Sequence, residues 1–258
     1  MVIVENLTKV YSNKSQGDVK ALDGISFTVE PGEVCGYLGA NGAGKSTTIK
    51  IMCGILSATS GSVSINGINI SQQPEKVKQI IGYVPESGAL FLSLTPYDFL
   101  EFVCRMYDID KQIYNHRIYT FMDMFDLKNE VRTPMHTFSK GMRQKVLLVS
   151  SLIHNPEIIF WDEPLSGIDY STTIIVRNLV KELSEAGKTF FYSTHLIESV
   201  DKVCSKIIIL NRGKIAYEGS INGLNGENPE DIMKKYASSG DISGKMPGLY
   251  NDISTQKE

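Results

Sequence analysis

The chain has 258 residues, of which 42% are hydrophobic and 21% charged. This balance is typical of a folded globular protein and argues against disorder. The 26 basic and 29 acidic residues give a formal net charge of −3, so the overall charge does not favour nucleic acid as a partner. The four cysteines stand singly, which argues against a zinc ribbon and fits a reducing compartment.

We expect neither a secretion signal nor a membrane span. The first residues lack a basic region followed by an apolar stretch. The longest apolar runs, such as residues 146–153, are shorter than the roughly 20 residues that cross a bilayer. The sequence therefore predicts a cytoplasmic chain that reaches a membrane only through another subunit.

The amino-terminal part of the chain reads as strands. Alternating apolar and polar residues predict strands over 2–7 and 25–30, with a polar loop over 12–18 between them. A short apolar run over 34–38 predicts a buried strand. Glycine then breaks the pattern over 39–44, and a helix is expected from Lys45.

Strands alternate with helices in the rest of the chain, which predicts a parallel sheet with crossover connections. Further strands are expected over 62–67, 80–84, 157–161, 189–193 and 207–210. Helical periodicity covers 95–127, 141–153, 172–185 and 196–203, and Thr95 is expected to cap the first of these. From about residue 224 the composition predicts a weakly ordered extension with no readable function.

Residues 39–46 match the pattern G-x-x-x-x-G-K-[ST] between a predicted strand and a predicted helix. In this context the backbone N–H groups of the loop and the helix N-terminus bind phosphates. Lys45 would place its charge on the β- and γ-phosphates, and Ser46 would ligate Mg²⁺. The pattern predicts a nucleoside triphosphate site, without separating kinases, GTPases, helicases and transport ATPases.

Two further predicted strands end in polar residues. Residues 158–161 lead into Asp162 and Glu163, which suit magnesium binding and proton acceptance from water. Taken alone, the acidic pair could simply be a strand-to-turn junction before Pro164. His195 follows residues 189–194, and its place at the end of a strand favours a γ-phosphate contact over a purely structural role.

Residues 138–145, Phe-Ser-Lys-Gly-Met-Arg-Gln-Lys, precede the acidic strand. With the three preceding motifs, in this order, the chain resembles the ABC transporter ATPase family over Val2 to Gly219. The resemblance implies an α/β fold, with a P-loop NTPase core around a mostly parallel sheet. It also implies an amino-terminal antiparallel β subdomain and an inserted α-helical subdomain at about 87–137. The ATPase domain would span 1–223 and the extension 224–258.

The resemblance also implies roles for individual residues. Glu163 and His195 match the catalytic carboxylate and the switch histidine, while Ser46, Glu86 and Asp162 would hold Mg²⁺. Tyr11 is assigned to adenine stacking by position only, so a strand-edge tyrosine remains the alternative. The residues implied in ATP binding are Tyr11, Gly39, Asn41, Gly42, Ala43, Gly44, Lys45, Ser46, Thr47, Ser139, Gly141 and Asp169.

The chain departs from the family pattern at Glu86 and within the signature, where Phe138 stands in place of leucine. Glu86 stands where the family has glutamine, which adds negative charge near the phosphates. A carboxylate can still ligate Mg²⁺ directly or through water. Lys140 and Met142 replace the first glycine and the glutamine of the usual Leu-Ser-Gly-Gly-Gln, while Ser139 and Gly141 are kept. We therefore expect an active ATPase.

The resemblance implies an exporter subunit that works with a membrane permease and a second ATPase chain, either a copy or a paralogue. In the family, the signature residues contact the nucleotide of the opposite subunit, so one chain cannot complete a site. Nucleic acid is not expected as a partner. The alternatives are a soluble ABC-type ATPase acting on ribosomes or DNA, and a regulatory subunit of an immunity or sensing complex. The transported substrate is not readable.

Overall fold

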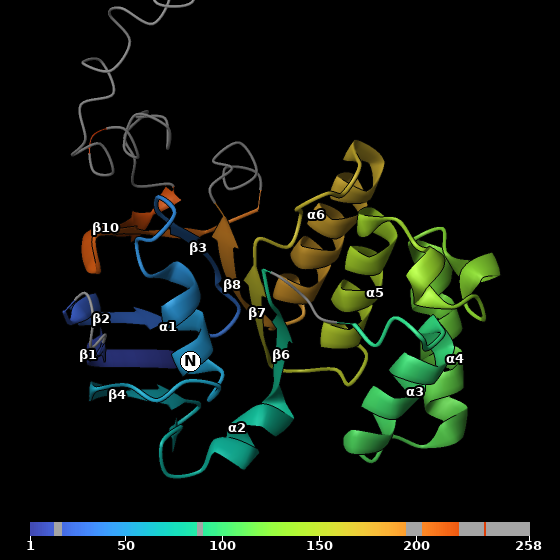
Figure 1. Ribbon diagram of the computed structural model, residues 1–258, viewed down its shortest axis with the longest axis horizontal. Coiled ribbons are helices and arrows are strands. Elements are labelled where there is room, and N and C mark those ends of the chain that lie inside the picture. The colour runs from blue at the N-terminus through green and yellow to red at the C-terminus, as the bar shows by residue number, and fades with distance from the viewer. Residues whose placement is uncertain (13–16, 87–89, 195–202, 222–234, 236–258) are drawn as a thin grey trace, which may run out of the picture.

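The computed structural model describes residues 1–12, 17–86, 90–194, 203–221 and 235. Two sheets lie on one side of the molecule and a group of helices on the other (Figure 1). Among the described helices, none combines the length and apolar character needed to cross a membrane.

The larger sheet has six strands in the order β10-β9-β3-β8-β7-β6. Five of them run parallel, and β10 pairs antiparallel with β9. The strands are β3 (Val34–Leu38), β6 (Ile81–Val84), β7 (Ile158–Asp162), β8 (Thr189–Thr194), β9 (Lys206–Asn211) and β10 (Lys214–Ser220). Every residue of β3, β7 and β8 is buried, as expected of strands covered on both faces. The predicted mostly parallel sheet is confirmed.

The second sheet is antiparallel, in the order β2-β1-β4-β5. It comprises β1 (Val2–Tyr11), β2 (Val19–Val29), β4 (Ser60–Ile65) and β5 (Ile68–Asn69). Both β1 and β2 are longer than the sequence predicted. The register of β1 against β2 shifts between Val4 and Leu7 and again between Leu7 and Lys9, so its side chains stop alternating. One hydrophobic cluster contains residues of this sheet, of α1 (Lys45–Met52) and of the six-stranded sheet.

Four long helices surround a second cluster: α3 (Pro96–Met106), α4 (Lys111–Met124), α5 (Lys140–Leu152) and α6 (Tyr170–Glu185). Thr95 caps α3 as predicted, accepting a hydrogen bond from the Asp98 N–H. The prediction of continuous helix over 95–127 is wrong. Asp108 takes a left-handed backbone with φ of 52°, and Asp110 starts α4 by accepting from the Gln112 N–H at 2.7 Å. Local aspartate chemistry breaks the helix where apolar periodicity continues.

The sequence also missed α2 (Pro74–Ile80), β5, β10 and the short 3₁₀ turns Lys128–Glu130 and Met135–Thr137. The predicted helix over 196–203 and the extension from residue 224 lie outside the described residues, apart from Val203 and Lys235. The limits 1–223 and 87–137 therefore stay predictions. The four cysteines are buried thiols, and burial raises the pKa of Cys35, Cys53 and Cys104.

Candidate functional site

A polar hollow of about 190 Å³ lies at the carboxyl ends of parallel strands β3, β6 and β7. This edge is where open α/β sheets bind their ligands. Stretches that are far apart in the sequence meet here, and all of them except the one that contains Ala21 are marked by a predicted motif or by the resemblance. The lining residues are Ala21, Asn41, Gly42, Gly44, Lys45, Ser46, Thr47, Glu86, Asp162 and Glu163.

Close backbone contacts explain two glycines of the loop over 39–44. A Cβ atom on Gly39 would lie 2.4 Å from the Leu210 carbonyl oxygen of β9. Gly44 has φ of 113°, and a Cβ there would lie 2.6 Å from the Ala21 oxygen of β2. Only glycine fits, so the loop packs against both sheets and α1 starts with its free N–H groups facing the hollow.

Lys45 is the cation of the hollow, and only 7% of its surface is exposed. Its Nζ donates to the Gly39 carbonyl at 2.7 Å and to the Ala40 carbonyl at 3.3 Å. Burial lowers the pKa of Lys45, while the charges of Glu163 and Asp162 oppose that shift. An ammonium held by neutral carbonyls beside a phosphate-sized hollow is suited to binding an anion.

Asp162 is 1% exposed and accepts a hydrogen bond from the Ser193 hydroxyl at 2.9 Å through Oδ1. Its Oδ2 is buried without a hydrogen-bond partner. Burial raises the pKa of Asp162, against the effect of the Ser46 and Ser193 hydroxyls, and the charge of Glu86 raises it further. An unpartnered carboxylate oxygen of this kind is an available ligand for a cation.

The hydroxyl of Ser46 donates to Glu86 Oε2 at 3.4 Å, so the three predicted magnesium residues meet at one corner of the hollow. Oxygen ligands of this type fit Mg²⁺, which keeps water and phosphate oxygens in its shell. Among the residues described, no cluster of three His, Cys, Asp or Glu side chains could hold a metal by itself. A magnesium ion here would therefore depend on the Ser46 hydroxyl and on the nucleotide.

Glu163 lies beside this corner and is 9% exposed. Its backbone is left-handed, with φ of 51°, a conformation that costs free energy in a residue with a side chain. The Glu163 N–H donates to the Ser193 carbonyl at 3.0 Å, and the Thr194 hydroxyl donates to Glu163 Oε2 at 3.3 Å. The end of β8 thus fixes both the backbone and the carboxylate of Glu163. His195, the next residue after β8, lies outside the described residues.

Tyr11 lies next to the loop without lining the hollow. Tyr11 is the last residue of β1 and is 42% exposed. Its hydroxyl lies 3.4 Å from the Thr47 hydroxyl. Lys9 Nζ lies 5.2 Å from the ring centroid on one face. An exposed aromatic ring beside the loop leaves room for a flat base.

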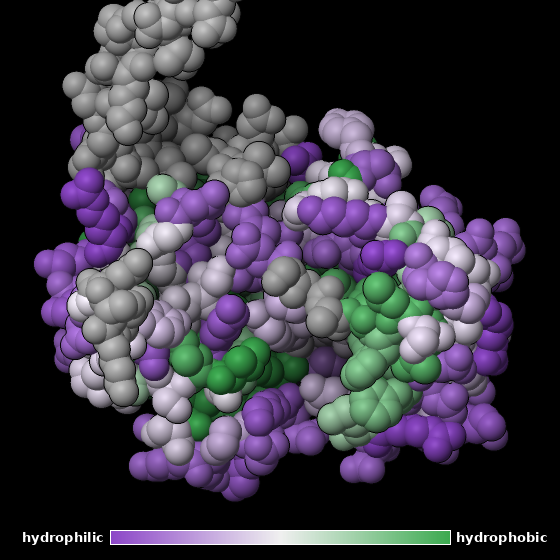
Figure 2. All heavy atoms as spheres, in the orientation of Figure 1, coloured by the Kyte–Doolittle hydropathy of each residue, from purple (hydrophilic) through white to green (hydrophobic). Residues whose placement is uncertain are grey.

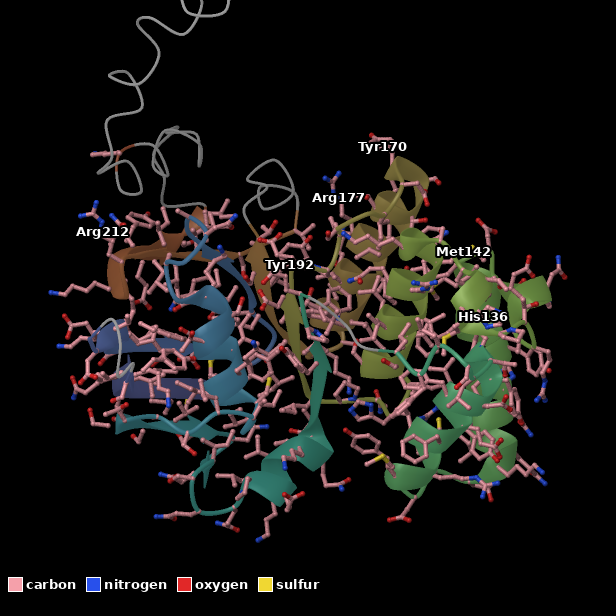
Figure 3. The ribbon with its side chains drawn as sticks, in the orientation of Figure 1. His136, Met142, Tyr170, Arg177, Tyr192 and Arg212 are labelled. Carbon is pink, nitrogen blue, oxygen red and sulfur yellow. The ribbon has the colours of Figure 1, made fainter. Side chains whose placement is uncertain are left out.

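The signature residues do not join the hollow. Ser139 caps α5, accepting from the Met142 N–H at 3.2 Å, and Asp169 caps α6, accepting from the Thr172 N–H at 2.8 Å. The hydrogen bonds to Asp169 lower the pKa of its carboxyl. In Figure 3, Met142 and Tyr170 mark the first turns of α5 and α6, which begin on the same side of the molecule.

Sequence reasoning missed two residues of the site. Ala21 contributes lining from β2, and nothing in its sequence context signals this. Ser193 pairs in register with Asp162 on the neighbouring strand. The strand that ends before His195 could have indicated Ser193, because parallel neighbours end at one edge of a sheet.

The family model described as ABC transporter matches residues 22–166, which include the phosphate loop, the signature and the acidic pair. The chain belongs to the ABC transporter family. It is an ATP-binding subunit of that family and an ATPase, and the predicted P-loop fold is confirmed.

An uncharacterised ABC transporter ATP-binding protein of Methanocaldococcus jannaschii is 37% identical over 234 residues, covering 91% of this chain and 80% of the relative. The linearmycin resistance ATP-binding protein LnrL of Bacillus subtilis is 34% identical, covering 87% of this chain and 70% of the relative. A solved dimeric ATP-binding cassette in a post-hydrolysis state, bound to ADP and Pi, matches with a TM-score of 0.80 and 27% identity. It covers 86% of this chain and 100% of the solved one.

Proposed function

We propose that this chain powers export by a separate membrane permease, through ATP-driven pairing with a second ATPase chain. One observation carries the pairing. Ser139 and Gly141 lie at the start of α5 and do not line the hollow that holds Lys45. Residues that the family pattern assigns to the nucleotide can therefore reach it only on a second chain. The solved dimeric cassette with bound ADP and Pi supports this arrangement. The similarity to LnrL, which is named a linearmycin resistance protein, supports export.

We propose that ATP lies with its base on Tyr11 and its phosphates in the loop from Gly39 to Thr47. The polar backbone of the loop and Lys45 would bind and orient the triphosphate. Ser46, Glu86 and Asp162 would hold Mg²⁺, which supplies charge neutralisation at the phosphates. The full set of nucleotide contacts remains the one that the family pattern implies.

Glu163 is proposed as the general base. Its carboxylate is held by the Thr194 hydroxyl beside the hollow, where it can accept a proton from an attacking water. His195 is proposed to orient the γ-phosphate, an assignment that rests on the sequence motif. Ser139, Gly141 and Asp169 would act on the ATP bound by the partner chain.

The permease would bind in a groove of about 310 Å³ that lies between the residues following α1 and helix α3. The lining of the groove is mixed, with exposed Ile55 on one side and exposed Met106 on the other. Its polar residues include Glu75, Lys78, Gln79, Ser150 and Ser151. Figure 2 shows apolar surface over α3 and a second apolar area beside the lower end of α1. A short amphipathic helix of a membrane subunit would cover both. The proposal places the chain on the inner face of the membrane, held there by the permease.

The test is tagged Glu163→Gln, purified from detergent-solubilised cells with Mg·ATP. We expect ATP binding to persist and hydrolysis to fall about 10²- to 10⁴-fold, the usual contribution of a general base. A stable dimer and a stoichiometric polytopic membrane protein should copurify. Glu185→Gln, an exposed carboxylate on α6, is the matched control and should hydrolyse ATP normally. Copurifying ribosomal proteins, or a monomer alone, would refute the exporter proposal.

A further inference from the structure

The segment 164–169, which follows Glu163, is held on α5 by three side chains of that helix. Gln144 Nε2 donates to the Pro164 carbonyl at 3.0 Å. Lys140 Nζ donates to the Ser166 hydroxyl at 3.1 Å. Lys145 Nζ lies 3.6 Å from Asp169 Oδ2. The helix that begins at the signature therefore holds this segment near its start, middle and end.

Two glycines bring the segment against α5. A Cβ atom on Gly141 would lie 2.7 Å from the Gly167 carbonyl oxygen, so only glycine permits this contact. Gly167 has φ of 77°, and a Cβ there would lie 3.1 Å from the Lys140 Cδ. The aliphatic part of Lys140 thus packs over Gly167 while its ammonium reaches Ser166. Movement of the start of α5 would be passed directly to this segment.

The segment is continuous with Glu163. The Ser166 N–H donates to the Glu163 carbonyl at 3.1 Å, which closes the turn after the left-handed residue. A residue with a side chain keeps a left-handed backbone only where its neighbours enforce it. Ser166 is one of those neighbours, and its hydrogen bond from Lys140 joins the signature helix to the turn after Glu163.

We propose that Lys140 is a positioning residue for hydrolysis, which acts through Ser166 on Glu163 and makes that carboxylate respond to the nucleotide bound by the partner chain. This inference rests on the proposed function, because only in an ATP-bound dimer does the start of α5 face the partner's nucleotide. Ser139 and Gly141 would contact that nucleotide, and the adjacent Lys140 would transmit the contact to Ser166. The two ATP sites would then be coupled through each chain's own helix α5.

We expect the fold to tolerate the loss of this contact. The side chain of Gln144 is buried and holds the segment independently, whereas Lys140 is exposed. Exposed cations contribute little to global stability. Loss of the Lys140 ammonium should therefore change turnover more than it changes unfolding.

The test compares Lys140→Met, Lys140→Arg, Ser166→Ala and the double variant Lys140→Met with Ser166→Ala, all in the full chain. We expect kcat to fall about three- to tenfold in Lys140→Met and in Ser166→Ala, which is the range of one lost hydrogen bond. KM should change less than twofold, and the Hill coefficient for ATP should fall toward 1 in both. The double variant should be no slower than the single ones, because the two residues act in one contact. Lys140→Arg should restore kcat.

Lys181→Met is the matched control, since Lys181 is exposed on α6 and lies only 4.0 Å from Glu185 Oε1 in a surface pair. It should keep the wild-type kcat and Hill coefficient. Unchanged kcat in Lys140→Met, a rise confined to KM, or multiplying effects in the double variant would each overturn the inference. A separate measurement, ATP-dependent dimerisation of Glu163→Gln, distinguishes failure of this inference from failure of the proposed function. If the dimer forms, the outcomes above refute only the role of Lys140. If it does not, the proposed function fails and the inference fails with it.

Discussion

Asp162→Asn is expected to stabilise the nucleotide-free protein while weakening its binding of Mg·ATP. The carboxylate is 1% exposed, and its Oδ2 has no hydrogen-bond partner. Glu86 and Glu163 add like charge nearby, and both raise the pKa of Asp162. The amide keeps an oxygen for the Ser193 hydroxyl and removes the buried charge.

The expected gain is about 1 kcal/mol in the free energy of unfolding. A buried polar group without a partner costs about 1–3 kcal/mol and a charged one costs more, so the neutral amide recovers only the excess that is due to the charge. Attraction between Asp162 and Lys45 opposes part of that cost, since the Asp162 charge raises the pKa of Lys45. For a chain of this length, 1 kcal/mol corresponds to about 2–4 °C in melting temperature.

The assay is thermal and urea unfolding without nucleotide, in chelator, over a range of pH. The pKa of Asp162 is raised above its ordinary value of 3.8, so the folded state binds the proton more tightly than the unfolded state. The charged form is therefore destabilising at neutral pH, and this penalty fades as the pH falls through the raised pKa. The advantage of the variant should shrink between neutral pH and 3.8.

Saturating Mg·ATP should reverse the order, because a ligand that binds only the folded state stabilises it in proportion to its affinity. Asp123→Asn is the control. That carboxylate is 59% exposed and lies 3.2 Å from Lys128 Nζ, so its loss should change stability by less than 1 kcal/mol. Equal or lower stability of Asp162→Asn at neutral pH would refute the argument that the site stores an uncompensated charge.

Three further predictions concern base binding, pairing and docking. Tyr11→Ala should weaken ATP binding about tenfold by calorimetry and Tyr11→Phe should not, because stacking needs the ring alone. Equal affinities of the wild type and both variants would exclude Tyr11 from the ATP site. Gly141→Ala, made in Glu163→Gln, should abolish the ATP-dependent dimer in light scattering while single-chain ATP binding persists, since the new Cβ would lie 2.7 Å from the Gly167 oxygen. Met106→Glu should prevent copurification of the proposed membrane subunit without slowing basal ATP hydrolysis, and retained copurification would exclude the groove as its docking site.

The core of the site could be predicted from sequence because phosphate chemistry constrains short, contiguous stretches. Lys45 and Ser46 sit in one loop, and Asp162 with Glu163 ends one buried strand. Parallel strands share a carboxyl edge, so these stretches had to meet. Ala21 could not be found this way. It reaches the hollow from β2 because a register shift near Leu22 and close packing on Gly44 place it there.

Apolar periodicity also could not predict contacts between segments that are distant in the sequence. The bond between Lys140 and Ser166 joins residues 26 apart on two separate elements. Likewise, β10 pairs with β9 through backbone groups and has no fully buried residue, so its sequence shows little apolar alternation. The helix break at Asp108 shows the opposite limit, where a local preference for a left-handed backbone overrode a correct apolar pattern.

The buried thiols have a practical consequence for mapping this protein's neighbours. Reaction with maleimides or with another thiol needs an accessible thiolate. All four cysteines are buried, and burial raises the pKa of Cys35, Cys53 and Cys104. The natural cysteines can therefore stay in place. A cysteine introduced at exposed Ile55 or Met106 would be more reactive than the four buried natural cysteines. Crosslinks formed from it in native membranes would identify what occupies the groove.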